Sequence, residues 1–426
     1  MLADEALDIG GRLAFVLPAT VLTGSRWAPI RRLLLSKYAV EWVVVSHDLR
    51  NRSAKKGLPG RRLVSFSEST RIAEVLIVAT RRRKGDPTDN RAYFVNLLRN
   101  PDEPIEALAL TRKLLAMREG FVPLEPAAIG IGETTWGNAV SVPQGDLPLD
   151  GGPWSLAAFV QPGLALIAKR IALGKQGGLG SVPIAELGKL ADFGPYEMQI
   201  KNPKQGLFTI RERPLGATDP EWELRAGFPA LWRHKAFRNK SLEARADSRL
   251  ERRADRGRSD QDRMLAQQAR LQLARELGMA PQRVAAVITD TPMLGVRSWT
   301  SVLPRSPAPG KNEALCLWLN STLGLLLRIM HGNRPYLGRS AVPTELASTM
   351  PVLDVDRLSN GQLAAATAVY ADLKHRELQG FSALAADPVR RKINERLSRE
   401  VLGIDPGIVA DITRKLALEP TLHARH

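Results

Sequence analysis

The chain has 426 residues, 44% hydrophobic and 25% charged, which is typical of a folded protein of two or three domains. It carries 61 Lys and Arg against 44 Asp and Glu, a net charge of +17. This surplus suits a polyanionic partner, because each phosphate contact releases counterions, although a merely solvated basic surface is the alternative. A single cysteine, Cys316, excludes an internal disulfide framework, and scattered histidines argue against a structural metal.

The sequence also bears on where the protein works. Apolar stretches such as Ala314 to Leu327 are interrupted by polar residues and fall short of the roughly 20 apolar residues that cross a bilayer. The first residues, MLADEALDIGG, lack the basic start and apolar run of a secretory signal. We therefore expect a cytoplasmic protein without membrane contact.

The first hundred residues predict an α/β arrangement. Arg12 to Leu17 is a short apolar run closed by Pro18, which is typical of a buried strand. A helical stretch follows Ser25, and Val40 to Val45 and Glu74 to Ala79 are two further strands. Near-continuous apolar strands separated by a helix indicate a sheet that is buried on both faces, as in doubly wound folds.

A basic loop separates the second and third of these strands. Between Arg50 and Lys84 there are eleven basic and two acidic residues. A loop at the C-terminal edge of such a sheet faces the ligand cleft, so we predict phosphate contacts for its cations, with a solvated loop as the alternative. The predicted cations are Arg50, Arg52, Lys55, Lys56, Arg61, Arg62 and Arg71.

The rest of the chain changes character after a helical stretch over Asn100 to Ala116. Residues 120–230 are rich in Gly and Pro, which favours a second domain of short strands and loops. The tail from Ser359 to Leu418 is helical. We therefore divide the chain into regions at 1–118, 119–356 and 357–426.

Further elements are predicted inside the second and third regions. A mixed-charge stretch, Arg233 to Arg263, favours a solvated helix or mobile arm. The helix candidates are Gln261 to Leu277 and Leu323 to Met330, and the strand candidates are Val284 to Ile288 and Leu315 to Leu319. The tryptophans expected in cores or domain contacts are Trp136, Trp154, Trp222, Trp232 and Trp318.

Four segments in residues 5–82 occur in a recognisable order. They read GGRLAFVLP, a helix with Arg31-Arg32, VEWVVVSHD, and FSESTRIAEVLIVATR. This order resembles the end of the catalytic domain in the adenine-N6 DNA methyltransferases of restriction–modification systems. Three later segments, ALCLWLNST, NRPYLGRS and MPVLDV, resemble the specificity region that is fused to many of these enzymes.

The resemblance implies a fold and a division of labour. The implied fold class is α/β, with a partial Rossmann-like methyltransferase sheet consisting of its last three strands. An α+β DNA target-recognition domain over 119–356 and a helical C-terminal region would follow. The implied partner is double-stranded DNA, and the implied cofactor is S-adenosylmethionine.

The motifs that hold the donor and activate the adenine amine are missing. In the family, an (Asn/Asp)-Pro-Pro-(Tyr/Phe) loop positions the amine. Asn100-Pro101 and Asn202-Pro203 lack the second proline and the aromatic residue. The Gly-rich stretches at 130–132 and 174–180 do not clearly follow a strand or open a long helix, so a phosphate or cofactor site there is disfavoured. We therefore expect no catalytic or cofactor-binding residue in this chain.

The incomplete sheet makes a prediction about partners. The strand Arg12 to Leu17 would normally pair with the strand that leads into the catalytic loop, and without it an unpaired ladder remains. We expect the chain to dock on a separate polypeptide that carries the N-terminal half of the methyltransferase, or to be a truncated product.

Individual residues follow from the resemblance. It implies that Phe66 stacks on the adenine after the base is rotated out of the duplex; a hydrophobic plug at a strand start is the alternative. Arg297, Arg334 and Arg339 are candidates for reading guanine, with phosphate contact or salt bridging as alternatives.

Three hypotheses remain open from the sequence. The chain is the DNA-reading part of an adenine methyltransferase, a non-catalytic DNA-binding specificity subunit, or a basic scaffold or RNA-binding protein. The third has only the charge in its favour, because the chain lacks the aromatic signatures of common RNA modules.

Overall fold

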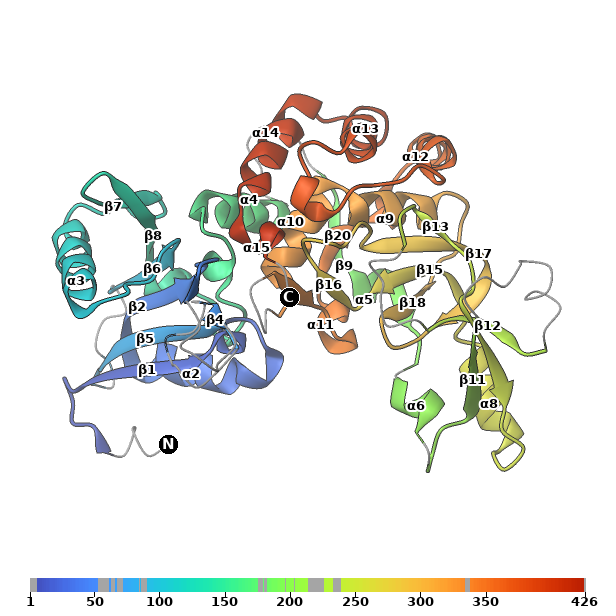
Figure 1. The fold of residues 1–426 in the computed structure, drawn as a ribbon, viewed down its shortest axis with the longest axis horizontal. Helices are drawn as coiled ribbons and strands as arrows, with labels where there is room; N and C mark the ends of the chain where they lie inside the picture. Colours follow the sequence, from blue (N-terminus) through green and yellow to red (C-terminus); the bar gives the residue numbers. More distant parts are fainter. Residues whose placement is uncertain are drawn as a thin grey trace. The chain divides into compact units, whose positions relative to one another are not determined.

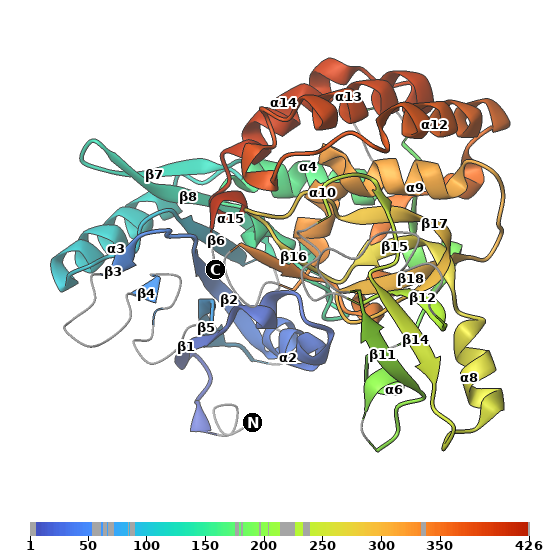
Figure 2. The same ribbon diagram turned by 45° about the vertical axis from the view of Figure 1, so that its right-hand side comes forward.

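The structure is a computed structural model, and it divides the chain into two compact units. Unit 1 comprises residues 1–170, 329–341 and 418–426, and unit 2 comprises residues 171–328 and 342–417. Both are drawn in Figure 1 and, turned by 45°, in Figure 2. The structure describes residues 6–52, 61–62, 66, 72–83, 85, 90–174, 179, 182–195, 197–202, 204–213, 226–232, 239–333 and 338–424.

Unit 1 is built on one mixed sheet, whose strand order is β1-β5-β2-β6-β8-β7. The strands are β1 (Arg12–Pro18), β2 (Tyr38–Ser46), β5 (Glu74–Arg81), β6 (Arg91–Leu97), β7 (Ala127–Ile131) and β8 (Thr134–Pro143). Strand β5 is antiparallel to both β1 and β2, and β2 is parallel to β6. Strands β1, β2 and β6 therefore run in the same direction and end at the same edge of the sheet.

The three strands predicted in the first hundred residues are confirmed, and so is the helix that follows, α3 (Pro104–Arg118). The region boundary at residue 118 differs from the structure, since unit 1 continues to Arg170. Strand β6 pairs along its whole length with residues 137–143 of β8, and β7 pairs with β8 as a hairpin. The glycines of this stretch therefore serve the hairpin turn, where Gly132 has a φ of +59°, and do not mark a new domain.

The two faces of the sheet are covered by different elements. On one face, α3 packs Leu110 and Leu114 against a cluster that includes Val95 and Trp136. On the other face lie α2 (Ala28–Lys37) and two short 3-10 helices, η1 (Ala19–Leu22) and η4 (Ser155–Ala158). Phe94 of β6 meets Trp154 edge to face, with ring centroids 6.3 Å apart. The sheet is therefore buried on both faces at β2 and β6, as predicted for β2, but not at β1.

The β1 corner of the sheet is covered less well. Phe15 is 42% exposed and Val16, on the opposite face of the strand, is 45% exposed. Val16 pairs with Leu76 of β5, and in that row of side chains Ala14 is exposed while Leu76 and Val78 are only partly buried. Among the described strands, none pairs with the outer edge of β1. The corner therefore has an apolar face and an open ladder of backbone groups.

Unit 2 contains a larger sheet with the strand order β10-β18-β15-β17-β12-β14-β11, and β13 pairs with β17. The strands are β10 (Ala191–Phe193), β11 (Phe208–Glu212), β12 (Phe228–Leu231), β13 (Glu243–Ala244), β14 (Ser248–Arg252), β15 (Ala269–Ala274), β17 (Ala286–Gly295) and β18 (Trp299–Pro304). A separate pair joins β9 (Ile184–Glu186) to β20 (Pro351–Leu353).

Two element predictions in unit 2 are wrong. The expected helix over Gln261 to Leu277 ends early, as α8 (Arg258–Leu265), and β15 follows because Leu271 and Leu273 are buried between β17 and β18. The expected strand over Leu315 to Leu319 lies inside α9 (Lys311–Asn320), which is buried all round. A short, fully apolar run does not distinguish a buried strand from a buried helix.

The helical tail is confirmed as α12 (Asn360–Leu373), α13 (Pro388–Arg396) and α14 (Pro406–Ala417). Arg390 of α13, which is fully buried, fixes it to the core: its Nη1 donates to the Asn320 carbonyl at 2.6 Å and its Nη2 to the Arg283 carbonyl at 2.7 Å. Its guanidinium carbon lies 4.6 Å from the centre of the Phe381 ring. Burial lowers the pKa of Arg390 to about 10, while Asp387 acts in the opposite direction.

Neither a membrane-spanning helix nor a metal-binding cluster is found among the described residues. No single described helix is long and apolar enough to cross a membrane; α9 and α10 (Thr322–His331) pass that test only as a pair, on length and composition, with a 72° bend between them. In the part of the chain that the structure describes, no group of three or more His, Cys, Asp or Glu could hold a metal ion.

Candidate nucleic-acid interface

The edge at which β1, β2 and β6 end is where a ligand cleft is expected in an open α/β sheet. The predicted basic loop leaves β2 at this edge. Its first cation, Arg50, lies in a network with Asp48, Asn100 and Asp102. Asp48 is fully buried and also accepts a hydrogen bond from the Asn100 backbone N–H at 2.8 Å. The end of β2 and the end of β6 are thereby joined.

Arg50 uses most of its donors inside this network. Its Nε and Nη2 reach the Asp48 carboxylate, at distances down to 2.7 Å. Its Nη1 donates to Asp102 at 2.7 Å, and its Nη2 also donates to the Asn100 carbonyl at 2.8 Å. The hydrogen bond to Asp48, ahead of the one to Asp102, raises the pKa of Arg50 above its ordinary value. Four of the five N–H groups that a guanidinium carries are thus engaged, which makes Arg50 primarily a structural residue here.

The structure describes little else of the predicted basic loop. Strands β3 (Asn51–Arg52) and β4 (Arg61–Arg62) form a short antiparallel ladder in which Arg52 lies opposite Arg61. The side chains of these two arginines and of Arg62 lie outside the described residues, as do Lys55, Lys56 and Arg71. Their predicted phosphate contacts remain predictions.

Phe66 is half-buried and packs against the cluster beneath α3 that also contains Trp42 and Leu76. A side chain with this contact stabilises the less covered corner of the sheet. This position fits the alternative of a hydrophobic plug, and stacking on a rotated base remains a prediction.

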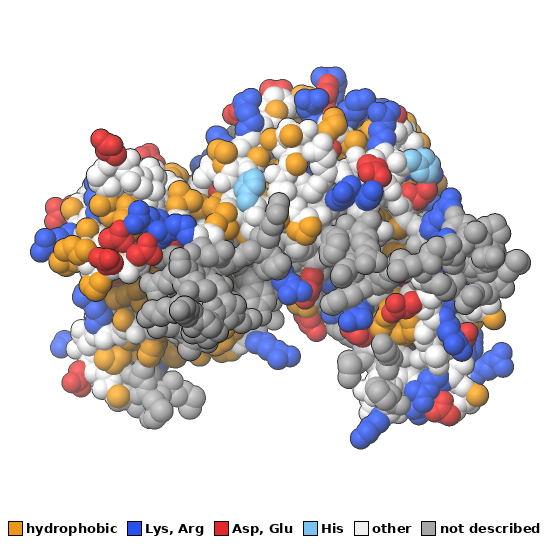
Figure 3. All heavy atoms as spheres, in the orientation of Figure 1, with side chains coloured by type: hydrophobic (Ala, Val, Ile, Leu, Met, Phe, Trp, Pro, Cys, Tyr) orange, Lys and Arg blue, Asp and Glu red, His pale blue; other side chains and the backbone are white. Residues whose placement is uncertain are grey.

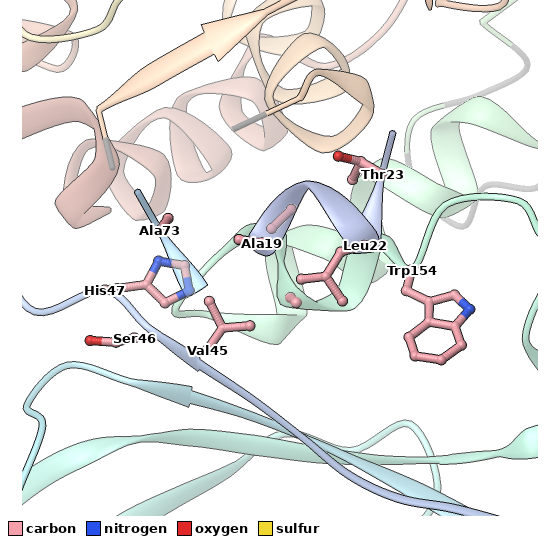
Figure 4. Close-up of a pocket in the computed structure, with 10 residues that line it drawn as sticks. Ala19, Leu22, Thr23, Val45, Ser46, His47, Ala73 and Trp154 are labelled. Carbon is pink, nitrogen blue, oxygen red and sulfur yellow. The ribbon is translucent and has the colours of Figure 1, made fainter. Parts of the chain in front are cut away.

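A small cavity lies beside the same edge. It has a volume of about 20 Å³, which is room for about one water molecule. Figure 4 shows His47 at the end of β2 on one side of it and Trp154 on the other, with Leu22 and Thr23 of the η1 segment between them. His47 is buried, and its Nε2 lies 3.4 Å from the Asn96 Oδ1. The cavity is far too small for a nucleoside or a methyl donor.

Comparisons with known proteins find structural neighbours but no sequence relatives. No family model and no curated protein matches the chain. The structure is similar to that of the type IIG restriction endonuclease BpuSI, with a TM-score of 0.43 and 12% identity, covering 99% of this chain and 48% of that one. A protein of a type I restriction–modification system gives a TM-score of 0.22 and 21% identity, covering 34% of this chain and 28% of that one. The chain thus spans about half the length of BpuSI.

The described residues do not fit S-adenosylmethionine. The glycines at 130–132 form the turn of the β7–β8 hairpin, not a loop between a strand and a helix. Asn100 is 6% exposed, and its backbone is bound by Asp48 and Arg50. Asn202 accepts hydrogen bonds from two backbone N–H groups of its own turn, at 2.8 and 3.2 Å. The Asn202 side-chain oxygen is therefore occupied by its own turn, and the Asn100 side chain is buried.

Of the three arginines predicted in the second region, two are described. Arg297 lies in the turn between β17 and β18 with a φ of +66°, a left-handed conformation that is uncommon for a residue other than glycine. Its Nε lies 3.8 Å from Glu197 Oε1. Arg339 begins β19 (Arg339–Ala341) and is partly buried, while Arg334 lies outside the described residues. Arg297 belongs to unit 2 and Arg339 to unit 1, and their predicted roles in reading guanine remain predictions.

The second basic stretch of the sequence forms a structure that sequence reasoning did not anticipate. Residues expected to be a solvated helix or mobile arm form β14 and α8 and close a small core with β11 and β12. Several of its charges pair locally, as in Arg211–Glu251 at 3.0 Å and Arg252–Asp262 at 2.5 Å. Figure 3 shows Lys and Arg side chains around this part, at the lower right of the view. In β14 the buried Ser248 and Leu250 alternate with the more exposed Arg249 and Glu251, a period of two that could have indicated a strand.

Proposed function

We propose that this chain is the DNA-recognition part of a DNA adenine-N6 methyltransferase of the restriction–modification type. In this proposal the strands that carry the donor-binding loop and the catalytic motif pair with β1, from another polypeptide or another segment. S-adenosylmethionine would bind to those strands, not to the residues described here. The chain itself would bind duplex DNA and support the geometry of the target base.

The observation that carries the proposal is the open corner at β1. Parallel strands of an α/β sheet are normally covered on both faces and paired on both edges, whereas β1 exposes Phe15 and Val16 on opposite faces. An edge of this kind is a template for another strand. An added strand would form hydrogen bonds with the free backbone groups of β1. A helix following that strand would also cover the partly exposed side chains around Leu76. An added βα unit would complete this corner of the sheet, which supports the proposal.

The motif order of the sequence supports the same assignment. The segments that resemble the methyltransferase family correspond to β1, α2, β2 and β5 in the expected order and with the expected element types. These elements share one sheet, in which β1, β2 and β6 point their C-terminal ends to one edge. In that arrangement the basic loop after β2 would lie where a bound duplex approaches the sheet.

The net charge supports duplex DNA as the partner. A charge of +17 on 426 residues favours a polyanion. Phosphate contacts supply most of the sequence-independent affinity and make it fall steeply as salt rises. We therefore expect the logarithm of the association constant for duplex DNA to decrease linearly with the logarithm of the salt concentration.

A non-catalytic specificity subunit is the second candidate, favoured by the structural engagement of Arg50 and Phe66. Arg50 is bound to two carboxylates, and Phe66 packs in the core below α3. If neither residue contacts DNA, the chain contributes recognition and not base handling.

Two titrations of the purified chain test the proposal. With S-adenosylmethionine we expect no saturable binding by calorimetry; binding at micromolar levels would contradict assignment of the donor site to other strands. With a random-sequence duplex we expect affinity that drops by at least tenfold between low and moderate salt, and an uncharged dextran serves as the control. Absent or salt-insensitive duplex binding would remove the DNA role and both candidates with it.

A further inference from the structure

A polar hollow lies on unit 2 between α6 (Glu197–Lys201), the turn before β11, and α8. It encloses about 310 Å³, at the lower end of the roughly 300–1,000 Å³ of ligand pockets. Its lining is amide-rich and contains one acid and one arginine. The lining residues are Gln199, Gln205, Leu207, Asp260, Arg263, Met264 and Gln267.

The walls of the hollow are fixed by buried hydrogen bonds. Gln261 of α8 is 2% exposed, and its Nε2 donates to the Leu207 carbonyl at 3.0 Å and to the Arg253 carbonyl at 2.9 Å. Arg256 donates from Nη2 to the Lys204 carbonyl at 2.7 Å. Met264 packs in the core that β11, β12 and β14 share. The hollow is therefore a preorganised surface feature, and its rim is held on secondary structure.

Two side-chain amides on this rim are available to a ligand. Gln205 lies in the turn that Asn202 caps, where Asn202 accepts the Gln205 backbone N–H at 3.2 Å. Gln267 follows α8, and its backbone N–H donates to the Met264 carbonyl at 3.0 Å. Within the described part of the chain, neither amide side chain has an interaction partner. Each amide offers a donor and an acceptor side by side.

Charged groups around the hollow complete the pattern. Arg263 donates to Asp260 at 2.7 Å, but both side chains are more than half exposed, so the pair is weak and can open for a ligand. Lys204 and Arg258 are exposed, and no described residue pairs with their side-chain charges. The amides could form hydrogen bonds with the edges of bases, and the cations beside them could contact the phosphates on either side.

The geometry points to this hollow, centred on Gln205 and Gln267, as the base-reading element of the protein for duplex DNA. The inference rests on the proposed DNA-binding function and assigns its sequence specificity to residues that no sequence motif indicated. Glutamine pairs bidentately with the N6 and N7 groups of adenine, and Arg263 could read guanine in the same groove. Lys204 and Arg258 would contact phosphates, which position the protein without reading sequence.

The test is selection from a randomised duplex pool with the full chain, comparing wild type, the double variant Gln205→Ala/Gln267→Ala and the matched control Gln379→Ala. Gln379 is an exposed glutamine of the same unit, far along the chain in the tail. We expect the wild type and the control to enrich one common motif. The double variant should lose preference at one or two positions of it, with affinity for that motif lowered about 10-fold to 100-fold.

The outcomes separate the inference from the function beneath it. Gln205 and Gln267 are at least partly exposed, so unchanged thermal unfolding of the double variant checks that it remains folded. Lys204→Ala should weaken binding to all sequences alike and reduce the salt slope by about 1. The inference is overturned if wild type and double variant select the same motif, or if the wild type selects no motif. In either case salt-dependent duplex binding would leave the proposed DNA-binding function intact. A wild type that retains no duplex at all overturns the DNA role itself.

Discussion

The open edge of β1 makes the isolated chain prone to self-association, and one charged substitution should suppress it. Val16→Lys places an ammonium on the exposed row of the edge strand, which is a common natural protection against edge-to-edge pairing. Val16 is already 45% exposed, so the fold should lose less than about 1 kcal/mol.

The size of the effect on association follows from exposure. Full burial of a Val or Phe side chain contributes about 1.5–3 kcal/mol. Phe15 and Val16 are 42% and 45% exposed, so covering the remainder of both contributes about 2 kcal/mol, or roughly 30-fold in affinity. Lysine at position 16 removes the contribution of valine burial and adds the cost of desolvating a charge. The affinity of self-association should therefore fall at least tenfold.

Sedimentation velocity over a concentration series measures this directly. Wild type should show concentration-dependent association, and Val16→Lys should move the midpoint to at least tenfold higher concentration. Ile105→Lys is the control, since Ile105 is 67% exposed on α3 and away from the edge. A wild type that remains monomeric at every concentration, or a control that dissociates as readily as the variant, would refute the reasoning about the β1 corner.

Three further predictions concern single residues. Arg390→Met should lower the free energy of unfolding by about 3–5 kcal/mol, because it removes two hydrogen bonds to carbonyls and leaves the buried Asp387, 3.6 Å from Arg390 Nε, without its counter-ion. Arg328→Met should cost less, because burial lowers the pKa of Arg328 to about 9 and, among the described residues, its guanidinium donates one hydrogen bond, to the Ala274 carbonyl. Equal losses of both variants in urea unfolding would contradict this contrast. Cys316 is fully buried, and burial raises its pKa above the ordinary thiol value, so the native protein should resist an alkylating reagent that modifies the urea-unfolded chain; rapid labelling of the native protein would contradict the packing of α9. Phe66→Ala should lower the unfolding free energy by about 1–2 kcal/mol if the role of Phe66 is packing. If the base-stacking prediction holds, the same change in a reconstituted methyltransferase should reduce methylation more than duplex affinity. Equal losses of methylation and duplex affinity would leave only the packing role.

The sequence by itself determined the elements that depend on local pattern. The apolar runs of β1, β2 and β5 predict strands, and the helix between β1 and β2 follows from periodicity. The predicted burial on both faces holds for β2 but not for β1. The helical tail could be predicted for the same reason. Burial of Trp136, Trp154, Trp232 and Trp318 could also be predicted, because side chains of this size are costly to expose.

Only the tertiary structure decided which elements belong together. β7 and β8 join the first sheet through pairing with β6, a long-range contact that glycine content in the sequence did not indicate. The run around Leu317 is part of a helix that is enclosed on all sides. Since a buried helix and a buried strand are equally apolar, the sequence could not distinguish between them. Arg50 was predicted to contact phosphate from its neighbours in sequence, but Asp102, which is 52 residues away, takes up one of its donors.

The hollow on unit 2 brings together residues whose proximity could not be predicted from the sequence. Gln205 and Gln267 are 62 positions apart, the first in a stretch predicted to hold short strands and loops and the second in a predicted helix. They line one surface because β11 pairs with β14 and α8 folds back on both, held by the buried Gln261. Local sequence indicates apolar faces and helical periodicity, which are short-range, whereas the hydrogen bonds of a strand join residues that are distant in sequence. The position of an exposed side chain relative to a distant one depends on how those elements pair, and the sequence does not encode that locally.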